Sequence, residues 1–247
     1  MLLEKLFVTG ITGSLNMDSV QGKLIVIEGT DGVGRSTQIE NLKTWLELNG
    51  HAVMTTGLAR SALMGRVINE AKSGHSLNPY TFSLLYLADF ADCLEQQIIP
   101  ALKSGFIVLA DRYFYTAFAR AVVRGIPKEW IRQAYAFAPA PHLIFYLNIS
   151  IENLIPRVIN EHTFHEQYWE YGTEEGMDYW ESGMDMKFGD DFYESFIEYQ
   201  RRILEEFASM SQEFNLTVVD ASKSFDVTNK FLKEQIATLI GQAPLPQ

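Results

Sequence analysis

Five short apolar stretches rich in β-branched residues recur along the chain, at residues 24–27, 52–55, 106–109, 143–147 and 216–219. Within each stretch the apolar character is continuous and does not alternate with polar positions. This pattern is typical of strands that are buried on both faces of a parallel sheet. Because segments with helical periodicity separate the stretches, the chain is predicted to fold as an α/β protein with right-handed crossovers.

The clearest helix is predicted to begin at Asn78 and Pro79, since Asn accepts hydrogen bonds from first-turn amides and Pro presets the first helical φ. Its apolar positions recur at helical spacing and form one face: Leu84, Leu87, Ala88, Ala91, Leu94 and Ile98. The spacing does not distinguish a core face from a face between subunits. The fold class predicted is three-layered, with a five-stranded parallel sheet flanked by helices, and ligands of such sheets bind where the strands end.

Residues 22–241 are expected to form one domain, because no linker rich in Pro and Gly divides them and the length suits a single core. Residues 1–21 lack a periodic pattern and are expected to be a flexible extension. Residues 161–191 are rich in Tyr, Trp, Glu and Asp without an apolar period. They are expected to form a mobile lid or an inserted loop.

Composition narrows the classes of function. A formal net charge of -11 disfavours direct binding of nucleic acid, so a phosphate site has to be a local pocket. Apolar residues make up 47% of the chain, but no run reaches the roughly 18 residues that span a membrane. Cys93 is the single cysteine and no cleavable signal pattern is present, which together favour the cytoplasm.

A glycine-rich loop follows the first predicted strand and precedes a helical stretch at 38–48. It reads Gly29-Thr30-Asp31-Gly32-Val33-Gly34-Arg35-Ser36-Thr37 and matches the phosphate-binding pattern G-x-x-x-x-G-K-[ST], except that Arg35 replaces lysine. Backbone amides of such a loop surround the phosphates of ATP, and the Ser36 hydroxyl is a predicted Mg²⁺ ligand. Arginine keeps the charge of lysine but is longer, planar and forked, so the predicted catalytic role of Arg35 is weaker than its role in binding.

From about Gly22 to Ile240 the chain resembles the thymidylate kinase family. The resemblance rests on the glycine-rich loop, on 84–89 (LLYLAD), on Asp111-Arg112-Tyr113, on 141–147 (PHLIFYL) and on 219–222 (VDAS). It implies that Asp31 approaches the sugar hydroxyl of the acceptor nucleotide, that Asp111 acts near Mg²⁺ and that Arg112 holds the acceptor phosphate. A structural ion pair is the alternative for Asp111 and Arg112.

Several positions depart from the family pattern. Gly57 stands where an arginine is expected, with Arg60 or Arg66 as substitutes, and Phe90 stands where the family places a base-contacting arginine. Phe118-Ala119-Arg120-Ala121 replaces a tyrosine-glutamine pair. In the lid, Arg157 keeps a basic position, but no arginine accompanies Asp178, so Arg120 and Arg124 are further candidates for stabilising the phosphoryl group.

By this resemblance the protein is an ATP-dependent, Mg²⁺-requiring nucleoside monophosphate kinase, cytoplasmic and homodimeric, whose acceptor is dTMP or a related nucleotide. Catalysis is assigned to Arg35, Asp111, Arg112 and Arg157. Binding of the acceptor nucleotide is assigned to Asp31, Arg60, Tyr86, Phe90, Arg112 and Arg120. Two alternatives remain open from the sequence: a catalytically weak nucleotide-binding sensor, and a kinase of a non-nucleotide acceptor.

Overall fold

A computed structural model describes residues 20–73, 77–161, 180, 183–190 and 192–242. Within them, five parallel strands form one sheet in the order β2-β3-β1-β4-β5. The strands are β1 (Lys23–Glu28), β2 (Val53–Gly57), β3 (Ile107–Asp111), β4 (Leu143–Asn148) and β5 (Thr217–Asp220). All five predicted strands are confirmed, with ends that differ by one or two residues.

The helices alternate with the strands as the pattern predicts. They are α1 (Arg35–Leu48), α2 (Gly65–Ser73), α3 (Pro79–Cys93), α4 (Ile99–Lys103), α5 (Phe114–Val123), α6 (Lys128–Ala134), α7 (Ile151–Glu161), α9 (Phe192–Glu213) and α10 (Phe225–Leu239). A π-helical turn, Leu94–Ile98, joins α3 to α4. Among the described helices, none combines the length and apolar character that crossing a membrane requires.

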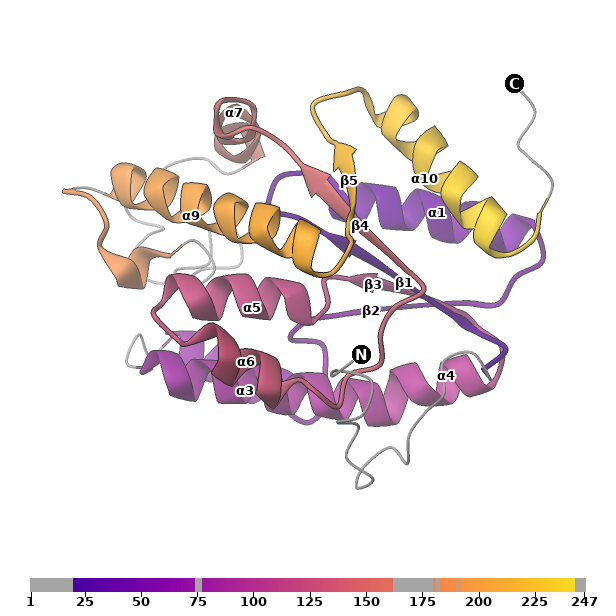
Figure 1. The fold of residues 1–247 in the computed structure, drawn as a ribbon, viewed down its shortest axis with the longest axis horizontal. Coiled ribbons are helices and arrows are strands. Elements are labelled where there is room, and N and C mark those ends of the chain that lie inside the picture. Colours follow the sequence, from indigo (N-terminus) through magenta and orange to yellow (C-terminus); the bar gives the residue numbers. More distant parts are fainter. Residues whose placement is uncertain (1–19, 74–76, 162–179, 181–182, 191, 243–247) are drawn as a thin grey trace.

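Helices cover both faces of the sheet (Figure 1). α1 and α10 lie on one face, and α3, α4, α5 and α9 lie on the other. The central strand β1 contributes to both cores, since Leu24 and Val26 pack into one cluster and Ile25 and Ile27 into the other. This arrangement explains why the strands lack polar alternation: neither side of the sheet faces water.

Helix α3 begins as predicted, with the Asn78 side chain accepting from the amide of Tyr80 and Pro79 in the first turn. Its predicted apolar face is only partly right. Leu94 and Ile98 are buried, whereas Leu84 is 50% exposed. The buried side of α3 carries Phe82, Ser83, Tyr86, Asp89, Phe90 and Cys93.

A polar interaction explains why the buried side of α3 differs from the predicted apolar face. Asp89 turns inward because its carboxylate accepts hydrogen bonds from the amides of Ala59 and Ser61, and a periodicity of apolar residues cannot reveal that requirement. The π-helical turn after Cys93 inserts one extra residue and brings Leu94 and Ile98 back to the core. The predicted domain limits stay predictions, because residues 1–19 and most of 161–191 lie outside the described residues.

Candidate active site

The glycine-rich loop connects the end of β1 to the start of α1 at the carboxyl edge of the sheet. Gly32 and Gly34 have φ values of 74° and 94°, which favour glycine. A Cβ atom at position 32 would also lie 2.8 Å from a methyl carbon of Val158. The loop therefore needs glycines at these positions, and the amino end of α1 that follows offers a positive electrostatic end to an anion.

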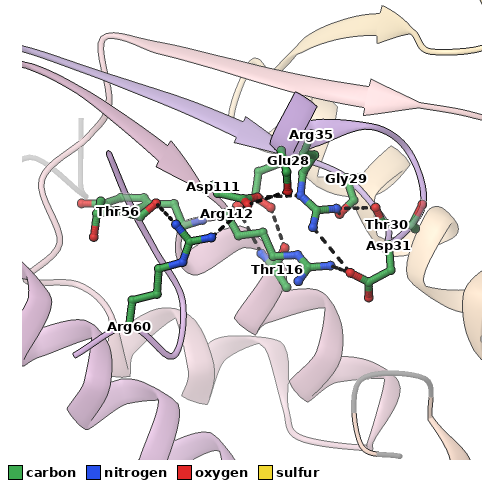
Figure 2. Close-up of polar contacts among 12 residues, drawn as sticks. Glu28, Gly29, Thr30, Asp31, Arg35, Thr56, Arg60, Asp111, Arg112 and Thr116 are labelled. Carbon is green, nitrogen blue, oxygen red and sulfur yellow. Dashed lines mark hydrogen bonds and ion pairs between the residues drawn. The ribbon is translucent and has the colours of Figure 1, made fainter. Parts of the chain in front are cut away.

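Arg35 is buried beneath this loop (Figure 2). Its Nε donates to Asp111 Oδ1 at 2.8 Å, and its Nη1 donates to the carbonyl oxygen of Gly29 at 2.7 Å. Nη1 also donates to the Thr30 carbonyl, and Nη2 lies 3.5 Å from Asp31 Oδ1. Burial is the main factor that lowers the pKa of Arg35. The side chain thus braces the loop from inside and ties it to the end of β3.

Asp111 joins three parts of the chain. Besides Arg35, it accepts from Arg60 Nη2 at 3.2 Å and from the Ser36 hydroxyl at 3.4 Å, both through Oδ2. The register of the sheet places it there, because Asp111 pairs with Ile27 of β1 and with Gly57 of β2. The two predicted Mg²⁺ ligands are therefore neighbours, although they are far apart in sequence.

Arg60 enters the site from the loop that follows β2. A Cβ atom at Gly57 would lie 2.5 Å from the Asp111 carbonyl oxygen and 3.2 Å from Arg60 Nε. A side chain at position 57 is therefore excluded unless the backbone shifts, and the Arg60 guanidinium packs against the glycine. The two oxygens of Asp89 bind the amides of Ala59 and Ser61, on either side of Arg60, at 2.7 and 2.9 Å. Arg66, the other predicted substitute, pairs with Glu70 on the surface of α2.

The carboxylate of Asp31 lies close to two further arginines, Arg112 and Arg120. Arg112 forms an ion pair with Asp31, and Arg120 Nη2 lies 3.7 Å from Asp31 Oδ2. Arg112 has a φ of 68°, an uncommon backbone conformation for a non-glycine residue. Strain of this kind costs about 1–3 kcal/mol and persists where surrounding contacts hold it.

The contacts that hold the Arg112 turn come from Glu28, which sequence reasoning missed. Its buried carboxylate accepts from the Tyr113 amide at 2.8 Å and from the Thr116 hydroxyl at 2.6 Å. Burial raises the pKa of Glu28 to about 7, against the hydrogen bonds from Thr116 and Tyr113 and the charges of Arg112 and Arg35, which lower it. The signal in the sequence was a charged residue that closes an otherwise apolar strand.

Four guanidinium groups, those of Arg35, Arg60, Arg112 and Arg120, thus surround the carboxylates of Asp31 and Asp111. Positive charge is in local excess in a chain whose net charge is -11. Arginine binds phosphate oxygens through paired donors, so this cluster suits a polyanion.

A second part of the loop borders a cavity of about 450 Å³, which is lined by Val33, Gly34, Thr37, Gln38, Leu147, Arg157, Ala221, Ser222, Lys223, Ser224, Phe225 and Thr228. Arg157 Nη2 donates to the Ala221 carbonyl at 2.9 Å. Arg157 therefore lies at this cavity rather than in the arginine cluster around Asp31. Lys223, Phe225 and Thr228 also line the cavity and were missed, because they lie beyond the 219–222 motif and form no distinctive pattern of their own.

Tyr86 and Arg120 both line a second, smaller cavity. Phe90 does not reach it. Its ring is buried in the core against Tyr113, Tyr135 and Phe137, so the structure gives it no open path to a substrate.

The described part of the predicted lid is anchored to the body through Arg124. This arginine binds both oxygens of Asp185 at 2.8 Å and the Tyr199 hydroxyl at 2.9 Å. Burial alone lowers the pKa of Arg124, but the Tyr199 hydroxyl and the Asp185 carboxylate outweigh it, so the pKa stands above its ordinary value. Arg124 is thus committed to anchoring, and Asp178 lies outside the described residues.

Comparisons of the sequence with known proteins identify its family. A sequence model of the family described as thymidylate kinase matches residues 27–175. The chain is 34% identical over 205 residues to a probable thymidylate kinase 2 of Saccharolobus solfataricus, covering 83% of this chain and 90% of the relative. A thymidylate kinase of Desulfotalea psychrophila is 36% identical over 138 residues, covering 56% of this chain and 68% of the relative.

A probable thymidylate kinase of Pyrococcus horikoshii is 32% identical over 145 residues, covering 56% of this chain and 71% of the relative. Neither the family match nor these relatives favour the alternative of an inactive sensor. The predicted resemblance and the predicted fold class are confirmed, and the chain belongs to the thymidylate kinase family.

Proposed function

We propose that this protein transfers the γ-phosphoryl group of ATP to dTMP, giving dTDP and ADP. The observation that carries the proposal is the meeting of four arginines at the end of the glycine-rich loop. Arg35 and Arg60 converge on Asp111, while Arg112 and Arg120 converge on Asp31. Phosphoryl transfer depends mainly on positioning and on charge stabilisation, and the site supplies both.

The donor is proposed to bind along the loop, with its phosphates on the backbone amides of Gly32 to Thr37. Its base and ribose would occupy the cavity of about 450 Å³ between Arg157 and the segment that follows β5. This cavity falls within the usual size range of a small-molecule site. The hydrogen bond from Arg157 to Ala221 fixes one wall of the cavity to the other.

The acceptor phosphate is proposed to bind between Arg112 and Arg120, with its oxygen in line with the γ-phosphorus. Arg60 approaches from the other side, and the Asp89 carboxylate holds its loop in place. No covalent intermediate is required: the acceptor oxygen forms a bond to phosphorus as the bond to the ADP oxygen breaks. Arginine charges oppose the negative charge that spreads over the phosphoryl oxygens.

Magnesium suits this site. The Ser36 hydroxyl and the Asp111 carboxylate are hard oxygen donors 3.4 Å apart, at the place where the donor phosphates would end. When bound, the ion would neutralise charge on those phosphates. Asp111 also pairs with Arg35 and Arg60, so one of these contacts has to lengthen before its carboxylate can serve a metal directly.

The test is release of ADP by purified protein with Mg-ATP, against a panel of nucleoside and deoxynucleoside monophosphates. We expect stimulation by dTMP above all others. Arg60→Met and Arg112→Met should raise the acceptor KM or abolish turnover, whereas Arg66→Met, on an exposed arginine of α2, should leave both unchanged. ATP binding without stimulation by any acceptor would refute the proposal.

A homodimer is also proposed. Leu63, Val67, Tyr80 and Leu84 are exposed apolar residues in or near α2 and α3, and a second copy of the chain would cover them. Light scattering after size exclusion tests this, with Leu84→Glu expected to give a monomer. The cytoplasmic location stays a prediction from the sequence.

A further inference from the structure

The hydroxyl group of Tyr135, the residue that follows α6, has no hydrogen-bond partner among the residues that the structure describes. The side chain is only 2% exposed. Nearly all buried polar atoms in folded proteins are hydrogen-bonded, and leaving one without a partner costs about 1–3 kcal/mol. The hydroxyl is therefore placed to bind a group that the described part of the chain does not supply.

Tyr135 lines the small cavity that also contains Phe82, Tyr86 and Arg120. Burial raises the pKa of Tyr135, and the nearby Asp89 and Tyr86 raise it further, so the phenol keeps its proton. Arg120 links this cavity to the phosphate site, because its guanidinium lies 3.7 Å from Asp31 of the glycine-rich loop. Arg120 thus lines the cavity together with the aromatic rings of Phe82, Tyr86 and Tyr135.

Of the neutral polar groups in this cavity, Ser83 is already engaged. Its hydroxyl donates to the Pro79 carbonyl at 2.9 Å within α3. The cavity measures about 10 Å³, which is room for about one water molecule, so a base can enter only if the side chains of its wall shift. A narrow space between aromatic rings favours a single flat ring over a fused pair.

We propose that the Tyr135 hydroxyl hydrogen-bonds the base of the acceptor nucleotide and selects pyrimidine monophosphates that carry a ring carbonyl. The inference rests on the proposed kinase function and adds a specificity-determining residue to it. A phenol that stays protonated donates to a carbonyl oxygen such as those of thymine, and the rings of Tyr86 and Phe82 offer a stacking surface. Phe90, where the family places a base-contacting arginine, is apolar, and its ring centroid lies 5.2 Å from that of Tyr135, so the Tyr135 hydroxyl is a polar group next to that position.

The experiment replaces Tyr135 by phenylalanine, which removes only the hydroxyl oxygen. Titration calorimetry with dTMP, without ATP, should show binding about tenfold weaker than in the wild type. In the kinetic assay the acceptor KM should rise, the ATP KM should stay the same, and the preference for dTMP over purine monophosphates should shrink. The thermal midpoint should not fall, because the lost hydroxyl has no hydrogen-bond partner among the described residues.

Tyr146→Phe is the matched control, since this buried tyrosine donates to Asn148 Oδ1 at 3.1 Å. It should lower the thermal midpoint and leave dTMP binding unchanged. Equal dTMP affinity of wild type and Tyr135→Phe, within twofold, would mean that the hydroxyl binds water only and would overturn the inference. So would a wild type that binds no monophosphate. If the wild type binds dTMP but forms no ADP, the kinase proposal fails while the Tyr135 comparison still decides this one.

Discussion

Arg35 Nε lies 2.8 Å from Asp111 Oδ1, so the arginine that replaces the usual lysine of the glycine-rich loop joins that loop to the end of β3. A lysine has a single terminal nitrogen, so it could not reproduce the contact of Nε with Asp111 and the contacts of Nη1 with the Gly29 and Thr30 carbonyls from two separate nitrogens. The substitution therefore adds a brace between the two strands that carry the site, in addition to preserving a positive charge. Its effect on stability and its effect on ATP binding can be separated by mutation.

Arg35→Met should lower the free energy of unfolding by about 3 kcal/mol, because it leaves buried Asp111 with one cation fewer. Arg35→Lys should cost about 1 kcal/mol, since the charge remains and the forked contacts are lost. ATP affinity should fall about tenfold or more in the methionine variant and much less in the lysine variant. Urea unfolding and nucleotide titration measure the two effects, and equal stability of all three proteins would contradict the brace.

Glu28 should make stability depend on pH. Its pKa is raised from 4.5 to about 7 by burial, so the folded state holds this proton more tightly than the unfolded chain. The contribution is fully present below pH 4.5 and is lost as the pH rises through 7. Relative to Glu28→Gln, which does not titrate, the wild type should lose about 3 kcal/mol over this range. Urea unfolding at steps between pH 4.5 and 8 checks this, and parallel curves for the two proteins would rule it out.

The stability of variants at position 112 should reveal the energetic cost of the backbone conformation of Arg112. Because φ is 68°, the free energy of unfolding of Arg112→Gly should be about 1 kcal/mol higher than that of Arg112→Ala. Both variants lose the guanidinium group. Thermal unfolding of Arg112→Gly and Arg112→Ala makes the comparison directly. Both should bind the acceptor poorly. A more stable alanine variant would show that the turn is not strained.

Asp89 should affect binding of the acceptor indirectly, because it holds the loop that carries Arg60. In Asp89→Asn one of the two amides, of Ala59 or Ser61, would face an NH₂ group instead of an oxygen, so the loop that carries Arg60 should loosen. The acceptor KM should rise about tenfold while the ATP KM stays unchanged. Because the two residues act on one contact, Asp89→Asn combined with Arg60→Met should be no worse than Arg60→Met alone. Additive losses in the double variant would separate Asp89 from Arg60.

The sequence by itself determined the layers of the fold and the place of the phosphate site. Continuous apolar strands require a sheet covered on both faces, and the glycines of 29–34 between strand and helix permit only a narrow set of loop structures. Asp111 and Arg112 could be named as site candidates because they stand at the end of a strand, where ligands of such sheets bind, whereas Arg120 was named through the resemblance to the family.

Only the tertiary structure decided how these groups pair. Which arginine reaches Asp111 depends on the register of β2 against β3, on the lack of space at Gly57 and on the inward turn of Asp89, all of which involve residues distant in sequence. Burial likewise decided the proton affinity of Glu28 and left the Tyr135 hydroxyl without a partner among the described residues. Periodicity records where apolar side chains go, whereas the pairing of polar groups in a core depends on three-dimensional neighbours that no local pattern encodes.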